Sequence, residues 1–220
     1  MTTTVTVYAD PVCAWAFLVL HRLRAARDHH GLDVVFDQRA WPLEWVNRTP
    51  PPPPSYFRRL TTALAADEPE LFADIPNTAP LATVLPAFDL VAAARRTCGP
   101  RAAEDLTYHL GCRFFRHGAD LAQPHELHQA AVDGGLPADT IMQVWCTEPV
   151  RDDVTTDYHH SQQLPIQGSP QIFWPDGSTT HNPALDRQAA ARLLRSRVLA
   201  PAGHGPTLAQ HPEPNPSPPR

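Results

Sequence analysis

The first forty residues switch between two spacings of apolar positions. Residues 3–9 alternate apolar with polar side chains, which predicts a strand. From Cys13 to about Arg27 apolar residues recur every three or four positions, with arginines between them, which predicts an amphipathic helix. Gly31 is expected to end this helix, and residues 33–41 favour a second strand. A right-handed crossover would make the two strands parallel.

Helical spacing dominates the middle of the chain, and a hairpin pattern follows it. Residues 55–164 predict an almost wholly helical block. Its helices are expected at residues 87–98, 101–115, 124–132, 138–146 and 150–163. Residues 168–174 and 179–181 are strand-like and flank the turn sequence Pro-Asp-Gly-Ser, which predicts an antiparallel hairpin. A last amphipathic helix is expected over residues 186–198.

Two proline-rich stretches punctuate this pattern. Five consecutive prolines at residues 50–54 predict an extended, stiff spacer where the opening strand-helix-strand unit ends. The last twenty residues contain seven prolines and few large apolar side chains, so residues 201–220 are expected to be a disordered tail.

Composition narrows the classes of function. The chain has 220 residues, of which 42% are hydrophobic, and a formal net charge of −5, which argues against nucleic acid as the main partner. All 18 basic residues other than histidine are arginine, so a lysine Schiff base is excluded. No apolar run approaches the roughly 20 residues of a membrane helix, and the N-terminus shows no signal-peptide pattern. We therefore expect a cytoplasmic protein that does not associate with membranes.

The candidate chemistry centres on Cys13, at the junction of the first strand and the first helix. A helix N-terminus favours an anion, so this position predicts a thiol of lowered pKa and raised nucleophilicity. The alternative is a small buried side chain, which is the commonest role of a free cysteine. The other cysteines, Cys98, Cys112 and Cys146, have no spacing typical of a disulfide framework or a zinc site.

Four sequence segments in a fixed order resemble the DsbA family, nearest its FrnE-like branch and the related hydroxychromene-carboxylate isomerases and kappa-class glutathione transferases. Residues 10–15, Asp-Pro-Val-Cys-Ala-Trp, resemble the start of the family's Asp-Pro-x-Cys-Pro-Trp-Cys, and residues 168–170, Gly-Ser-Pro, resemble its Gly-Val-Pro. Residues 39–43 and 114–120 resemble its post-strand segment and a helix end of its insertion. The resemblance covers roughly residues 3–198.

The resemblance implies an α/β, thioredoxin-like fold (β-α-β, then β-β-α) with a large all-helical insertion. Residues 1–54 and 165–200 would form the thioredoxin-like domain, and residues 55–164 the helical insertion. It also implies a cis peptide bond before Pro170, so that the backbone of Ser169 approaches the reactive sulfur. The alternative for Pro170 is an ordinary trans strand entry.

Active sites of this family lie where the thioredoxin-like unit meets the insertion. Trp15 and Trp41 are therefore expected to bind substrate beside Cys13, and Trp45 is a third candidate for an aromatic wall. Each tryptophan has the alternative role of a core side chain.

Two alanines depart from the family motif. Ala14 replaces the proline between the family's two cysteines, and Ala16 replaces the second, resolving cysteine. A dithiol enzyme releases a mixed disulfide by attack of that second thiol. In this chain the release would need an external thiol, or one of the three distant cysteines.

The leading hypothesis is a thiol-disulfide oxidoreductase that acts through Cys13 alone. Its partner would be a small-molecule thiol or disulfide, with glutathione or mycothiol as a possible co-substrate and no tightly bound cofactor. A thiol-cofactor-dependent transferase or isomerase, and a binding relative without redox activity, are the alternatives. His125 and His128 have helical spacing, but the partner ligands of a metal site are not evident, so no metal site is predicted.

Overall fold

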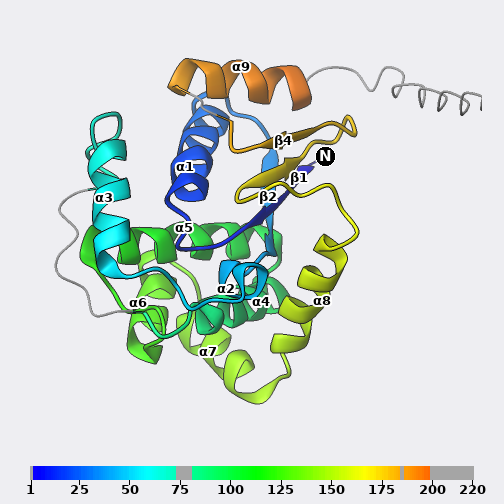
Figure 1. Cartoon of the computed structure of the whole chain (residues 1–220). Coiled ribbons are helices and arrows are strands. Elements are labelled where there is room, and N and C mark those ends of the chain that lie inside the picture. Colours follow the sequence, from blue (N-terminus) through cyan, green and yellow to red (C-terminus); the bar gives the residue numbers. More distant parts are fainter. Residues whose placement is uncertain (1, 73–80, 184–185, 199–220) are drawn as a thin grey trace, which may run out of the picture.

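The computed structural model describes residues 2–72, 81–183 and 186–198. The elements of this part of the chain are, in order, β1 (Thr3–Ala9), α1 (Ala14–His29), β2 (Val34–Ala40), α2 (Leu43–Asn47), α3 (Pro54–Leu64), α4 (Leu85–Cys98), α5 (Pro100–His117), α6 (Pro124–Asp133), α7 (Ala138–Thr147), α8 (Arg151–Ser161), β3 (Gln171–Phe173), β4 (Thr179–His181) and α9 (Arg187–Val198) (Figure 1). Sheet and helices thus follow the order that the hydrophobic pattern predicts.

The strands form one mixed sheet in the order β2-β1-β3-β4. β1 and β2 are parallel over their whole length, from Thr3 opposite Val34 to Ala9 opposite Ala40. β3 runs antiparallel to both β1 and β4. The parallel opening pair and the antiparallel hairpin are therefore confirmed.

One face of the sheet is covered by α1 and α9; in Figure 1, α9 lies above the strands and α1 lies to their left. The alternating apolar residues of β1, namely Val5 and Val7, contribute to this core and are fully buried. They pack with Leu23 of α1 and Leu194 of α9. The alternation of apolar and polar residues in β1 arises because every second side chain is buried in this layer.

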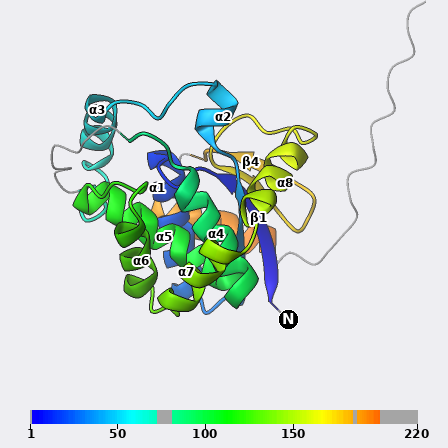
Figure 2. The ribbon, with the colours of Figure 1, turned by 90° about the horizontal axis from the view of Figure 1, so that it is seen from below.

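A second apolar cluster fills the block formed by α3 to α8, and α1 also contributes to it. Phe17 of α1 stacks on Phe115 of α5, with ring centroids 5.3 Å apart, and its edge meets Phe72 at 5.9 Å. Seen from below, α4 to α7 lie in front of α1 and α9 (Figure 2). Helix α1 is thus apolar on two sides, because it packs against both clusters.

Buried ion pairs join α1, α5 and β2. The Glu104 carboxylate is 1% exposed and lies 2.6 Å from an Arg24 nitrogen and 2.5 Å from an Arg27 nitrogen. It also accepts a hydrogen bond of 2.8 Å from the backbone N–H of Phe36. Two guanidinium groups and a backbone donor therefore compensate one buried charge.

Several expectations need correction or stay open. The proline spacer is shorter than predicted, because Pro54 is already the first residue of α3, where its missing N–H costs nothing. The short helix α2 was not predicted, since five residues show no helical period. The division into residues 1–54, 55–164 and 165–200 stays a prediction, and the expected tail at 201–220 lies outside the described residues. In the described part of the chain no helix is both long and apolar enough to cross a membrane.

Candidate functional site

Cys13 is the N-cap residue of α1, directly after the turn that follows β1. Its extended backbone (φ −80°, ψ 109°) ends the turn, and its carbonyl oxygen accepts the first hydrogen bond of the helix, from Phe17 N at 3.0 Å. Its own N–H donates to the carbonyl of Asp10 at 3.0 Å. The sulfur is partly exposed at the helix N-terminus, where the sequence places it.

The loop before β3 meets Cys13 through its backbone. The Cys13 thiol donates a hydrogen bond to the carbonyl oxygen of Ser169 at 3.3 Å. The Ser169 Oγ accepts a hydrogen bond from Asp10 N at 3.1 Å. The Ser169–Pro170 peptide bond is cis, in agreement with the expected geometry, and Pro170 is buried. Ser169 is thereby held against both ends of the turn that carries the cysteine.

The expectation that the Cys13 thiol has a lowered pKa is wrong. Burial raises the pKa of the Cys13 thiol, and the nearby Asp10 carboxylate adds to this rise. Hydrogen bonding to the Ser169 side chain and to the backbone N–H groups of Trp15 and Ala16 works in the opposite direction. The desolvation of the sulfur outweighs the helix N-terminus. Cys13 therefore rests as a protonated thiol at neutral pH.

Asp10 is a buried carboxyl group that organises the turn. Its Oδ1 accepts a hydrogen bond from Val12 N and its Oδ2 from Leu43 N, each at 2.9 Å. Burial raises the pKa of Asp10 to about 6, although these two donors lower it and Glu44 raises it further. The carboxylate thus connects the Cys13 turn to the first residue of α2.

A pocket with a volume of about 130 Å³ opens beside Cys13. It is bounded by the cysteine turn, α2, the proline stretch and α3. Its lining residues are Asp10, Val12, Cys13, Ala14, Trp15, Leu43, Glu44, Asn47, Thr49, Pro50, Pro51, Pro52, Tyr56, Phe57, Leu60 and Val84. A small molecule that enters this pocket would therefore reach Cys13 along mainly apolar walls.

The structure treats the three candidate tryptophans differently. Trp15 lines the pocket and is 39% exposed. Trp41 is 8% exposed and is not part of the pocket wall, so the structure does not bring it together with Cys13 there. Trp45 packs on Tyr158 with ring centroids 5.3 Å apart. Of the three, Trp15 lies where it can contact a ligand of Cys13, and substrate binding by Trp41 stays a prediction.

Among the described residues no second cysteine lines the pocket of Cys13. Ala16 is 2% exposed and packs in the core beside the sheet. Cys98 and Cys146 are exposed and Cys112 is buried in the helical cluster. The geometry therefore offers Cys13 no resolving thiol within this pocket.

Sequence reasoning missed the wall that faces Cys13. Leu43 and Glu44 come from α2, whose first turn is held by Asp10, and Pro50 to Pro52 come from the stretch that was interpreted only as a spacer. The signal available in the sequence was the Trp-Pro-Leu-Glu segment at residues 41–44, because a proline often precedes or opens a helix.

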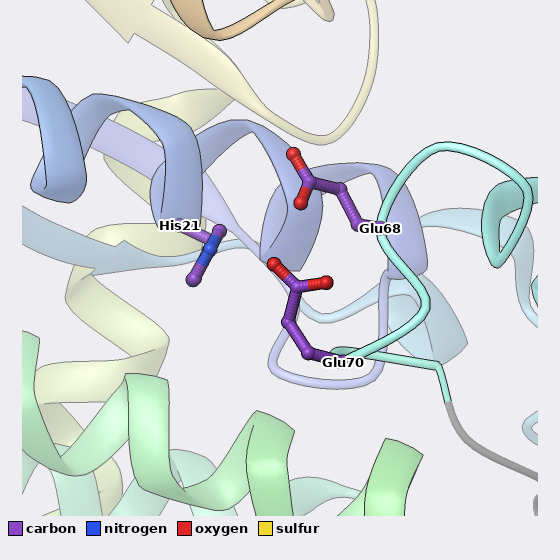
Figure 3. A group of neighbouring side chains, drawn as sticks. All are labelled: His21, Glu68 and Glu70. Atoms are coloured by element: carbon purple, nitrogen blue, oxygen red, sulfur yellow. The ribbon is translucent and has the colours of Figure 1, made fainter.

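A second group of titratable side chains lies on the other side of α1. The side chains of His21, Glu68 and Glu70 converge there, with ligand atoms within 4.8 Å of one another (Figure 3). Glu68 is bound to Arg22 at 2.8 Å, and both glutamates are bound to Arg187. These arginines hold the pKa of Glu68 low, at about 2. The carboxylates are thus already compensated by guanidinium groups, and the group is explained as an ion-pair cluster.

The protein-family model described as DSBA-like thioredoxin domain matches residues 4–193 of this chain. Among the curated proteins no match was found.

Solved structures share the fold over almost the whole chain. The cytosolic disulfide reductase DsbM from Pseudomonas aeruginosa has a TM-score of 0.62 and 20% identity, covering 88% of this chain and 95% of its own. Its structure with GSH gives 0.61 and 18%, covering 88% and 96%. A probable DsbA oxidoreductase from Streptomyces coelicolor gives 0.64 and 18%, covering 91% and 92%. A 2-hydroxychromene-2-carboxylate isomerase gives 0.58 and 13%, covering 88% and 97%. The predicted thioredoxin-like fold with a helical insertion is confirmed.

Proposed function

Because the chain belongs to the DSBA-like thioredoxin domain family, we propose that it is a thiol-disulfide oxidoreductase in which Cys13 is the only reacting sulfur of its motif. The observation that carries the proposal is the placement of Cys13 Sγ. Cys13 lines a pocket of about 130 Å³ and its Sγ lies 3.3 Å from the Ser169 carbonyl oxygen, while position 16 holds a buried alanine.

The proposed reaction takes two exchanges. Cys13 first loses its proton to solvent, and its sulfur attacks one sulfur of a disulfide R–S–S–R. A Cys13–S–S–R bond forms, the original S–S bond breaks, and R–S⁻ leaves. A second thiolate, R′–S⁻, then attacks the R-side sulfur, which releases R–S–S–R′ and returns the Cys13 thiolate. The disulfide substrate and the external thiol balance the electrons.

Three features of the site support this role for its side chains. The backbone N–H groups of Trp15 and Ala16 stabilise negative charge on Cys13 as it forms. The Ser169 backbone is positioned to pair with an extended substrate beside the sulfur, and Trp15 offers an exposed aromatic face to the group R. Substrate binding by Trp41 and Pro170 is also part of the proposal.

Glutathione or mycothiol is the proposed external thiol, and the cytoplasm the proposed location. DsbM, which has the same fold, is described as cytosolic and has been solved with GSH.

A thiol-dependent transferase or isomerase is the second candidate function. The raised pKa of Cys13 supports it, because a protonated thiol can donate a hydrogen bond to the sulfur of a bound thiolate without reacting. Such an enzyme needs no second cysteine.

One experiment distinguishes the two functions. The Cys98→Ser/Cys146→Ser protein removes the exposed thiols and is incubated with bis(2-hydroxyethyl) disulfide, with Cys13→Ser in the same background as the matched control. A mixed disulfide detected by intact mass on the first protein, released by added thiol and missing from the control, supports the oxidoreductase. If the added thiol binds noncovalently and no mixed disulfide forms on Cys13, the oxidoreductase function is excluded in favour of the second candidate function.

A further inference from the structure

The wall of the Cys13 pocket carries acidic side chains and no basic ones. Asp10 and Glu44 are the charged residues among its described lining residues, and neither arginine nor histidine is present there. Arg48 lies between two lining residues in the sequence, but its own side chain is exposed and is not part of the wall. A ligand in the pocket therefore meets negative charge.

The charge of Glu44 is held in place by neutral donors. Thr83 Oγ1 donates to both Glu44 oxygens at 2.9 Å, and Val84 N donates to Oε1 at 3.0 Å. These bonds fix the carboxylate at the start of α4 without cancelling its charge. Arg151 interacts electrostatically with Glu44, but its guanidinium group forms its ion pair with Asp89.

Asp10 contributes in the same way. Its hydrogen-bond donors are the backbone N–H groups of Val12 and Leu43, which carry no net charge. With a pKa raised to about 6, its carboxyl is mostly ionised at neutral pH. The pocket wall thus carries two carboxyl groups, one from the cysteine turn and one from α2.

Most of the remaining wall is apolar and rigid. It consists mainly of proline rings from residues 50–52, the aromatic rings of Tyr56 and Phe57, and the side chains of Leu43 and Leu60. Prolines have few rotatable bonds, so this side of the pocket is preorganised for an apolar surface.

We propose that the R group of the disulfide that Cys13 attacks is uncharged and apolar next to the sulfur, and that the pocket disfavours disulfides whose R group is anionic. The external thiol R′–SH attacks the R-side sulfur and is not part of this selectivity. The inference rests on the proposed exchange at Cys13 and names its substrate class. Carboxylates of an anionic partner would lie beside Asp10 and Glu44 with no cation in the wall to pair with them, and like charges at short range are unfavourable.

The test compares two aromatic disulfides that differ in charge. The Cys98→Ser/Cys146→Ser protein is reacted with neutral 4,4′-dithiodipyridine and with anionic 5,5′-dithiobis(2-nitrobenzoate). Each rate is divided by the rate of the same reagent with 2-mercaptoethanol, which removes the intrinsic reactivity. We expect the normalised rate to be about tenfold higher for the neutral reagent at low salt, and the ratio to shrink at 1 M salt because screening weakens the repulsion.

A matched pair of variants locates the effect in the pocket. Asn47 is an exposed lining residue at the end of α2, so substitution there should leave the fold intact. Asn47→Arg adds a cation to the wall and is expected to raise the normalised rate of the anionic reagent several-fold, with Asn47→Gln as the neutral control. The quantity compared between the two variants is the ratio of the anionic to the neutral normalised rate, which should rise for Asn47→Arg and not for Asn47→Gln.

The possible outcomes test the charge selectivity separately from the proposed exchange at Cys13. Equal normalised rates, or a preference for the anionic reagent, overturn the charge selectivity and leave the proposed exchange intact. Absence of any adduct on Cys13 with either reagent overturns both. The comparison on the unsubstituted pocket decides the inference even where Asn47→Arg does not fold.

Discussion

The sulfur of Cys13 lies 3.3 Å from the backbone carbonyl oxygen of Ser169, although 156 positions separate the two residues. The contact closes the site, because it joins the start of α1 to the loop that precedes β3. The hydroxyl of the same serine accepts a hydrogen bond from Asp10 N. One residue therefore sets both the position of the thiol and the hydrogen bonding of its turn.

The reactivity of Cys13 should rise with pH well into the alkaline range. Burial raises the pKa of its thiol in the folded protein, so the thiolate fraction at pH 7 is below that of an unhindered cysteine. Iodoacetamide labelling of the Cys98→Ser/Cys146→Ser protein should show no plateau below pH 9. Ser169→Ala should move the profile further to alkaline pH, because alanine lacks the side-chain hydroxyl of Ser169, whose hydrogen bond lowers the pKa of the thiol. A plateau below pH 7 would restore the thiolate predicted from the sequence.

Replacing Ala16 with cysteine should change the mechanism. Position 16 lies one helical turn after Cys13, and its backbone N–H is directed at the Cys13 sulfur, so Ala16→Cys completes a Cys-x-x-Cys pair. We expect an intramolecular disulfide on oxidation and release of the mixed disulfide without added thiol. Intact mass and the loss of two free thiols report it, with Cys13→Ser/Ala16→Cys as control. If the mixed disulfide on the Ala16→Cys protein still needs external thiol, position 16 is too deeply buried to act.

Asp10 should make stability depend on pH. Its pKa is raised to about 6 in the folded protein, so its stabilising contribution is complete below about pH 4 and is lost as pH rises to about 6. Asp10→Asn removes the titration but gives up one backbone acceptor, a constant cost. Its free energy of unfolding relative to the unsubstituted protein should therefore improve by about 3 kcal/mol between pH 4 and pH 7.

Urea unfolding at intervals across this pH range measures the difference. Asp152→Asn is the matched control, because Asp152 is exposed on α8. A difference for Asp10→Asn that is constant with pH contradicts the burial of an ionised carboxylate.

The ion pairs of Glu104 should carry far more stability than those at the surface. Glu104→Gln leaves the guanidinium groups of Arg24 and Arg27 without their buried counter-charge, and we expect a loss of about 3 to 5 kcal/mol. Arg96→Gln removes exposed pairs with Asp153 and Glu148 and should cost about 1 kcal/mol or less. Thermal and urea unfolding of both variants test the contrast. Similar costs for the two variants would show that the Glu104 network is solvated in solution.

The sequence by itself determined the elements whose periods are long or clear. The alternation in residues 3–9, the helical spacing after Cys13 and the Pro-Asp-Gly turn correspond to β1, α1 and the β3–β4 hairpin, because these patterns reflect which side of an element is buried. The local pattern also placed Cys13 at a helix start, whereas the cis bond before Pro170 was implied by the resemblance to the DsbA family.

Only the tertiary structure decided the character of the site. Burial of the sulfur raises the pKa of Cys13, and the Ser169 loop that contacts this sulfur comes from a distant part of the chain. Likewise, α2 and residues 50–52 form a wall because Asp10 binds Leu43 N across more than thirty positions. Local spacing cannot encode such contacts, since desolvation and charge in a pocket are sums over segments that folding brings together from distant parts of the chain.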